Sequence, residues 1–153
     1  MYIREHSVSR DIAAPADVVY AAITDVTHMG EWSPECYRCE WADGATEAAV
    51  GVMFDGHNRN GENEWSTQGR IVELVPNEKF VFHAVWGDFH FATWGYEIEA
   101  TDTGCTVTQH WEDLRPDNVI EGSASISGVA DRAAYNKEQM ATTLERLAAA
   151  LEG

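Results

Sequence analysis

The stretch that most constrains this chain is its C-terminal run from Val129 to Leu151, the only long and strongly helical segment in the sequence. Its large apolar residues recur at spacings of four, three and four, which forms one stripe along an amphipathic helix. At about 1.5 Å of rise per residue this helix would be roughly 35 Å long, enough to cross a small sheet. Ser127 stands at the position of an N-cap. The stripe consists of Met140, Leu144, Leu147 and Leu151.

The first half of this predicted helix is less apolar than its second half. Ala133, Asn136 and Lys137 lie on or beside the stripe in the turns that precede Met140. Two interpretations remain open at this point. Either this half is an exposed helix start, or it faces a cavity instead of a solid core.

The chain of 153 residues is predicted to form one domain over residues 1–153, long enough to bury a core without disulfides or metals. A net charge of -16 argues against nucleic acid and anionic membranes as partners, because both need a basic surface. No run approaches the ~20 apolar residues of a membrane span, so no membrane insertion is expected. The three cysteines give no disulfide framework and favour a cytoplasmic location. The oligomeric state, monomer or homodimer, stays open.

The N-terminal part is predicted to hold one strand and two short helices. The strand runs from residue 2 to residue 12. Pro15 suits the first turn of a helix that ends near Asp25. A second short helix covers about residues 26–29, and Gly30 is expected to cap its C-terminus.

Residues 35–112 contain apolar runs separated by short turns, which predicts an antiparallel meander. The polar stretch 56–63 is expected to be a loop, with His57, Asn58 and Arg59 either in a solvated turn or at a cavity mouth. Residues 113–128 are the least regular part and are predicted to form a short helix or a mobile flap. The predicted strands are 35–41, 49–55, 64–75, 79–86, 89–100 and 105–112.

The order of these elements and several short motifs are similar to a known family. The motifs lie at residues 14–20 (APADVVY), 29–35 (MGEWSPE), 75–80 (VPNEKF), 104–108 (GCTVT) and 143–147 (TLERL). They resemble the helix-grip fold of the START-like superfamily and, within it, the polyketide cyclase/dehydrase and lipid-transport (SRPBCC) family. The resemblance implies an α+β fold in which a curved antiparallel sheet of about seven strands wraps around the long C-terminal helix. It also implies an internal cavity for a hydrophobic ligand, but no particular reaction.

Strand alternation separates the side chains that face the helix from those that face outward. The aromatic faces are expected to point inward, which leaves His83, His110 and Glu112 outside. In the strand 64–75 the apolar residues change parity, so a bulge near Gly69 is expected.

The inward-facing side chains define a candidate ligand cavity. A solid aromatic core and a ligand cavity both fit their pattern, and the family resemblance favours the cavity. Gln109 is informative because an amide inside an aromatic face needs a protein group, a water or a ligand as its hydrogen-bond partner. The candidate lining residues are Phe54, Trp65, Phe80, Phe82, Trp94, Tyr96, Gln109, Trp111, Asn136 and Met140.

The pair Cys36 and Cys39 has the spacing of a redox or metal motif. However, residues three apart on a regular strand point to opposite faces. A structural zinc site would also need further ligands at suitable spacing. No nucleotide-binding or hydrolase motif is present, so no metal and no cofactor are predicted.

These observations predict that the protein binds a hydrophobic or amphipathic small molecule between the sheet and the C-terminal helix. Two alternatives remain open. The first is a cyclase, aromatase or dehydratase, in which Tyr96, Gln109 or Asn136 would supply hydrogen bonds to the substrate. The second is a protein-interaction domain with a vestigial cavity. No residue is assigned a catalytic role.

We predict that the folded protein needs no metal ion, because the cysteines and the scattered histidines do not form a ligand set. Elemental analysis of the purified protein should therefore find no stoichiometric zinc or iron. A stoichiometric metal, together with loss of the fold on chelation, would contradict this prediction.

Overall fold

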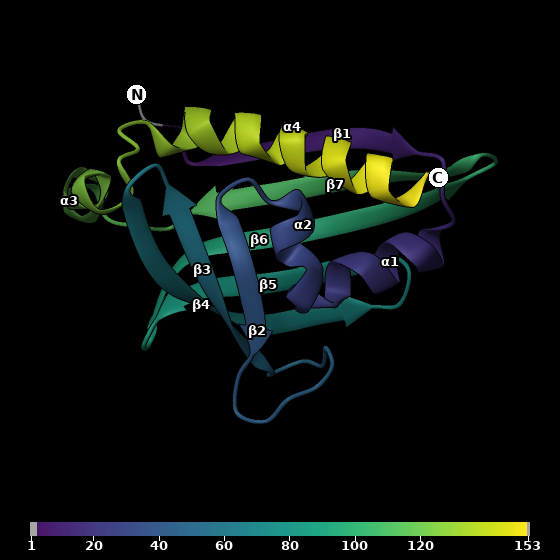
Figure 1. Cartoon of the computed structure of the whole chain (residues 1–153), viewed down its shortest axis with the longest axis horizontal. Helices are drawn as coiled ribbons and strands as arrows, with labels where there is room; N and C mark the ends of the chain where they lie inside the picture. Colours follow the sequence, from purple (N-terminus) through teal and green to yellow (C-terminus); the bar gives the residue numbers. More distant parts are fainter. Residues whose placement is uncertain (1–2, 153) are drawn as a thin grey trace.

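A computed structural model describes residues 3–152 of the chain (Figure 1). Its centre is one antiparallel sheet of seven strands in the order β1-β7-β6-β5-β4-β3-β2. Strands β2 to β7 form the predicted meander, and the last strand, β7, also pairs with the first strand, β1. The predicted start of β1 at Tyr2 lies outside the described residues. The strands are β1 Glu5–Ile12, β2 Cys36–Trp41, β3 Met53–Asn60, β4 Asn63–Val75, β5 Lys79–Trp86, β6 Phe89–Thr101 and β7 Gly104–Asp113.

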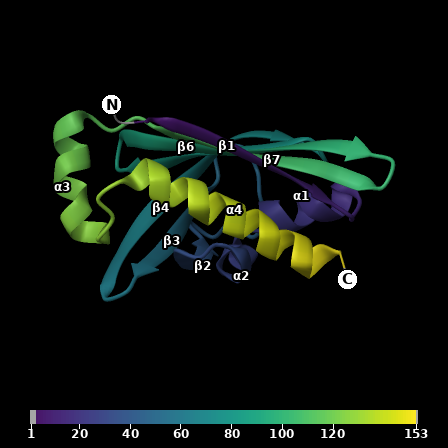
Figure 2. The ribbon, with the colours of Figure 1, turned by 90° about the horizontal axis from the view of Figure 1, so that it is seen from above.

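The sheet curls around one long helix, which confirms the α+β helix-grip fold (Figures 1 and 2). This helix, α4, runs diagonally across the concave side of the sheet when the molecule is seen from above. α3 lies near the start of α4 and the end of β7, which answers the open question about residues 113–128 in favour of a helix. The helices are α1 Ala16–Thr24, the 3-10 turn η1 Val26–His28, α2 Met29–Trp32, α3 Asp117–Ser127 and α4 Arg132–Leu151.

The long helix begins three residues later than predicted, and Ser127 is not its N-cap. Asp131 caps α4, because its side chain accepts a hydrogen bond of 3.2 Å from the backbone N–H of Ala134. Ser127 is instead the last residue of α3, and Gly128 follows it with φ of 73°. This left-handed conformation ends α3 and prevents one continuous helix from forming.

The second half of α4 forms the solid core of the molecule. Leu144 and Leu147 are almost completely buried, and they belong to one cluster with Val19 of α1, Phe80 of β5 and Val107 of β7. The first half of α4 belongs to a smaller cluster that contains several alanines. Small side chains leave volume between helix and sheet at that end, so the core is filled at one end and hollow at the other.

Gly30 does not cap a helix, since it lies inside α2. A Cβ atom at Gly30 would lie 2.3 Å from the backbone oxygen of Tyr37, so β2 passes too close to admit a side chain. The glycine therefore allows α2 and β2 to pack closely. Turn signals in the sequence do not reveal this role.

The polar stretch 56–63 is a hairpin and not a loop. β3 continues to Asn60 and β4 begins at Asn63, so only Gly61 and Glu62 form the turn. Polar residues here occupy a regular strand because alternate positions face solvent. His57 consequently lies outside, while Asn58 is buried.

The irregularity of β4 lies at Val72 and not at Gly69. The register with β5 shifts between Ile71 and Glu73, which explains the change of parity among the apolar residues. Gly69 has another role: a Cβ atom there would lie 2.2 Å from the ring of Phe54. The ring of Phe54 thus lies directly over the glycine.

The packing of α4 predicts a large effect of truncating one leucine. Leu144→Ala should lower the free energy of unfolding by about 2–5 kcal/mol, because a cavity remains in a closely packed region. Leu151→Ala is the matched control, since the same change at the half-buried helix end should cost clearly less. Urea unfolding of the three proteins measures both effects. Equal stability of Leu144→Ala and the wild type, or of a chain truncated at Gly128, would contradict the core role of α4.

Candidate ligand-binding pocket

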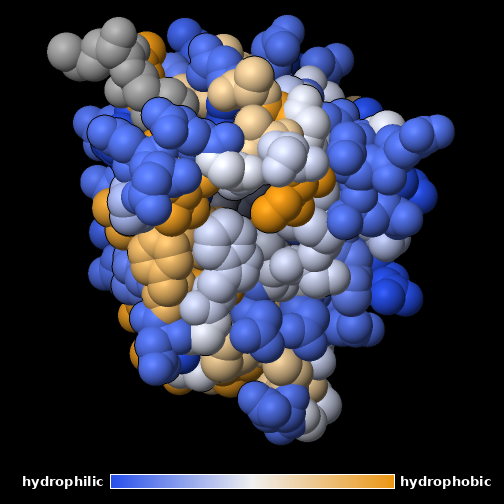
Figure 3. Space-filling model, turned by 90° about the vertical axis from the view of Figure 1, so that its left-hand side faces the viewer, coloured by the Kyte–Doolittle hydropathy of each residue, from blue (hydrophilic) through white to orange (hydrophobic). Residues whose placement is uncertain are grey.

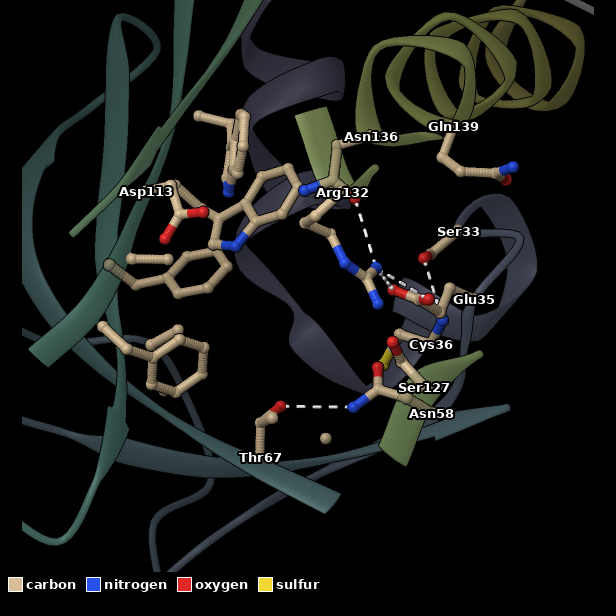
Figure 4. A pocket seen from close by; sticks show the side chains of 18 of the residues that line it. Ser33, Glu35, Cys36, Asn58, Thr67, Asp113, Ser127, Arg132, Asn136 and Gln139 are labelled. Atoms are coloured by element: carbon tan, nitrogen blue, oxygen red, sulfur yellow. Dashed lines mark hydrogen bonds and ion pairs between the residues drawn. The ribbon is translucent and has the colours of Figure 1, made fainter. Parts of the chain in front are cut away.

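A pocket of about 200 Å³ lies between the first half of α4, α3 and the inner face of the sheet. It lies at the hollow end of the core. Figure 3 shows the molecule from the side on which α3 lies, and a dark depression is visible among the surface side chains there. Figure 4 shows the interior, with side chains converging on it from α4 and from the strands.

Nine of the ten residues predicted to line a cavity line this pocket. They come from six elements: β3, β4, β5, β6, β7 and α4. Their role in ligand binding stays a prediction. The nine are Phe54, Trp65, Phe82, Trp94, Tyr96, Gln109, Trp111, Asn136 and Met140.

Phe80 is the exception and does not line the pocket. It is fully buried in the solid core, where its ring lies 5.6 Å from that of Phe82 and parallel to that of Tyr96. β5 runs from the filled end of the core to the hollow end. Parity placed Phe80 correctly on the inner face, but parity carries no information on position along the strand.

The apolar wall of the pocket consists mainly of aromatic rings. Phe54 and Phe82 meet edge to face at 5.1 Å, and Trp94 and Trp111 lie 6.3 Å apart. Ala84 and Ala92 are paired across β5 and β6 and also line the pocket, so their small side chains contribute to its volume. Flat rings beside alanines make a surface suited to an apolar molecule.

Two polar groups inside this apolar wall have no hydrogen-bond partner among the residues that the structure describes. The Gln109 side-chain oxygen, Oε1, is buried without a hydrogen-bond partner among the described residues. The Tyr96 hydroxyl likewise has none within residues 3–152. Burial raises the pKa of the Tyr96 phenol, and the nearby Cys36 thiol adds to the rise. The phenol is therefore neutral and able to donate a hydrogen bond.

The opposite side of the pocket is polar. Nη1 of Arg132 donates to both carboxylate oxygens of Glu35, at 2.7 and 2.8 Å, and to Oδ1 of Asn136 at 3.3 Å. Nδ2 of Asn58 donates to the Thr67 hydroxyl at 3.3 Å. Figure 4 shows Arg132 reaching from α4 towards Glu35, with Asn58 below it.

A second ion pair lies at the junction of β7 and α3. Asp113 accepts from Nε and Nη2 of Arg115 at 2.8 and 2.7 Å, and both side chains are buried. Nη1 of Arg115 also donates to the Ser123 hydroxyl at 2.6 Å. Because a buried charge without its partner is costly, this network holds α3 against the end of β7. Ser123, Ile126 and Ser127 of α3 then contribute to the pocket wall.

The prediction that Cys36 and Cys39 face opposite sides is wrong. The register with β3 shifts between Cys36 and Arg38, and this bulge brings both thiols to the buried face. A hydrogen bond with the Cys36 thiol, together with burial, raises the pKa of Cys39. Within residues 3–152 no group of three or more histidine, cysteine or acidic side chains could hold a metal ion. His110 and Glu112 lie outside the pocket, on the outer side of the sheet.

The charged lining residues Glu35, Arg132, Asp113 and Arg115 were absent from the sequence-based set. Glu35 and Arg132 are 97 positions apart, so no local pattern links them. One signal was available, because Arg132 lies four residues before Asn136 and therefore on the same helix face. Asp113 and Arg115 lay in the region that had no regular pattern.

Comparison with known proteins gives a family for this fold and pocket. The family described as polyketide cyclase / dehydrase and lipid transport matches residues 4–152. The chain belongs to this family. Its helix-grip fold is accordingly that of the START-like superfamily. No match was found among curated proteins. No helix within the described residues is long and apolar enough to cross a membrane.

Solved structures agree with the fold over nearly the whole chain. A protein from Chromobacterium violaceum is 20% identical with a TM-score of 0.73, and the match covers 99% of each chain. Ginseng major latex-like protein 151 from Panax ginseng is 14% identical with a TM-score of 0.74 and 97% of both chains covered. The di-domain ARO/CYC protein StfQ of the steffimycin biosynthetic pathway is 15% identical with a TM-score of 0.70, covering 97% of this chain and 50% of StfQ.

The unpaired amide oxygen predicts that Gln109→Leu stabilises the protein in the absence of ligand. A buried acceptor without a partner costs about 1–3 kcal/mol, and leucine fills a similar volume without that cost. Urea unfolding should therefore give a higher free energy of unfolding for Gln109→Leu than for the wild type. Gln139→Leu, at a half-exposed amide of the same pocket, is the control and should change little. A destabilised Gln109→Leu would mean that the amide is satisfied within the protein.

Proposed function

We propose that this protein binds a hydrophobic or amphipathic small molecule, lipid-like or polyketide-like, in the pocket between the sheet and α4. The observation that carries the proposal is Oε1 of Gln109, which is buried within an aromatic wall and has no hydrogen-bond partner in residues 3–152. Native proteins seldom leave such a group without a partner, and a ligand that donates a hydrogen bond would supply one.

The size and the apolar lining of the pocket support binding of a small apolar molecule at about micromolar affinity. Burial of apolar ligand surface is worth roughly 25 cal/mol per Å² before the costs of association are subtracted. A pocket of about 200 Å³ accommodates a small aromatic or a short acyl group. We infer that such a molecule needs no ion pair with the protein to reach about micromolar affinity.

Catalysis of the cyclase, aromatase or dehydratase type is the second candidate. The supporting observation is the Tyr96 phenol, which is buried, neutral and without a partner among residues 3–152. Such a donor could stabilise negative charge on a substrate carbonyl, while the walls hold a flexible chain in a reactive fold. The similarity to StfQ concerns the fold and leaves the reaction open. Turnover of a polyketide mimic would separate this enzyme from a carrier.

A protein-interaction role with a vestigial cavity is the third alternative, and a retained partner protein on purification would support it. The single-domain organisation, the cytoplasmic location and the absence of a cofactor stay predictions. Three free cysteines, all buried, agree with a reducing compartment.

The binding proposal predicts that filling the pocket abolishes ligand binding. Prodan, a neutral two-ring naphthalene dye that fluoresces in apolar surroundings, should bind the wild type and give a saturable signal. Ala92→Phe places a ring where the alanine lines the pocket and should remove that signal. Ala100→Phe is the matched control, because it makes the same change at an exposed position of the same strand.

Circular dichroism should show that both variants keep the fold. If Ala92→Phe binds the dye as tightly as the wild type does, binding occurs elsewhere and the proposal fails. As a second measurement, native mass spectrometry of protein purified gently from its own host would identify a bound ligand. A copurified apolar molecule in the wild type that is absent from Ala92→Phe is the expected result.

A further inference from the structure

The guanidinium of Arg132 has N–H donors that make no hydrogen bond to the described part of the chain. All of its hydrogen bonds within residues 3–152, to Glu35 and Asn136, are made by Nη1. Nε and Nη2 therefore lack acceptors among the described residues, although the side chain is only 15% exposed and lines the pocket. An arginine offers five N–H donors in a planar fork, so more than half of this fork is available to a ligand.

The position of the guanidinium is fixed from several sides. Both carboxylate oxygens of Glu35, the residue directly before β2, accept hydrogen bonds from Nη1. The rings of Trp65 and Tyr135 lie 5.8 and 5.3 Å from the guanidinium carbon. In Figure 4 the side chain of Arg132 extends into the pocket next to Glu35 and Asn58. A donor held in this way loses little conformational freedom when a ligand accepts from it.

The charge of Arg132 is already balanced. The carboxylate of Glu35 lies at 2.7 Å and is itself only 17% exposed. A ligand carboxylate on the free edge of the same guanidinium would therefore be close to a second negative charge in a poorly solvated place. Like charges at such separations repel, and the net charge of -16 adds to the penalty. A neutral acceptor avoids this penalty and keeps the hydrogen bonds.

We propose that Arg132 binds an uncharged acceptor of the ligand, such as a ketone, ester or amide carbonyl, and that Glu35 makes the pocket reject carboxylates. This inference rests on the proposed function and names its ligand class. The ligand is a neutral amphipathic molecule whose carbonyl lies at the polar side of the pocket. Its apolar body lies against the aromatic wall that contains Trp94 and Trp111.

Three probes with the same ring system test the proposal. 2-Acetylnaphthalene carries a neutral carbonyl, 2-ethylnaphthalene has no acceptor, and 2-naphthoate carries a carboxylate. Their dissociation constants at neutral pH are measured by isothermal titration calorimetry with the full chain. The ketone should bind about tenfold more tightly than the hydrocarbon, because hydrogen bonds to a charged donor are the stronger kind. It should also bind more tightly than the carboxylate.

Two variants assign these preferences to the ion pair. Arg132→Met keeps an unbranched side chain but removes the guanidinium. In this variant the ketone should bind no better than the hydrocarbon. Arg146→Met, the same change at an exposed position of α4, should keep the wild-type order. Glu35→Gln should shift the preference towards the carboxylate by about tenfold or more. Glu138→Gln on the exposed side of α4 removes the same charge and should leave the order unchanged.

The outcomes separate this inference from the function on which it rests. Equal affinity of ketone and hydrocarbon in the wild type, or tightest binding of the carboxylate, would overturn the inference and leave the binding function in place. An unchanged ketone preference in a folded Arg132→Met protein would do the same. If none of the three probes binds, the binding function itself fails and the inference falls with it. The wild-type ranking alone decides the matter if a variant does not fold.

Discussion

The packing of the second half of α4 against the sheet is the constraint on which the other features depend. Leu144 and Leu147 are buried among residues of α1, β5 and β7, and they fix the direction of a helix of 20 residues. Because a helix is stiff, the first half of α4 must continue over the sheet whether or not side chains fill the space beneath it. The pocket is thus a consequence of one well-packed end and one end with small side chains.

Two ion pairs line the hollow end, one between Glu35 and Arg132 and one between Asp113 and Arg115. Glu35 and Arg132 join the segment before β2 to α4. Arg115 joins Asp113, the last residue of β7, to Ser123 of α3. Buried charges with several hydrogen bonds define geometry well, because alternative arrangements leave a charge unpaired. The pocket therefore has a polar side and an aromatic side, a division that suits an amphipathic molecule.

Much of the fold was predictable because the sequence carries local signals for it. Strand β5 was predicted with its observed bounds, and the inward parity of Trp94, Gln109 and Trp111 agrees with their place in the pocket. The predictions were wrong where a backbone irregularity or a contact between distant segments determines how a residue is placed. A bulge after Cys36 turned both thiols inward, and the approach of β2 explains Gly30. Neither the bulge after Cys36 nor the contact between β2 and Gly30 produces a periodic pattern in the sequence.

The sequence by itself determined the order of strands and helices and the inward aromatic face, because hydrophobic periodicity and turn residues act over a few neighbouring positions. The helix-grip arrangement of these elements followed from their resemblance to a known family. Tertiary structure alone decided that Phe80 fills the core while Phe82, two residues further, borders a pocket. It also decided that Glu35 balances Arg132 from 97 positions away. The empty volume beside a side chain and the balance of charges around it depend on all the segments that pack there. Which segments pack together is set by the tertiary fold and not by neighbouring positions in the sequence.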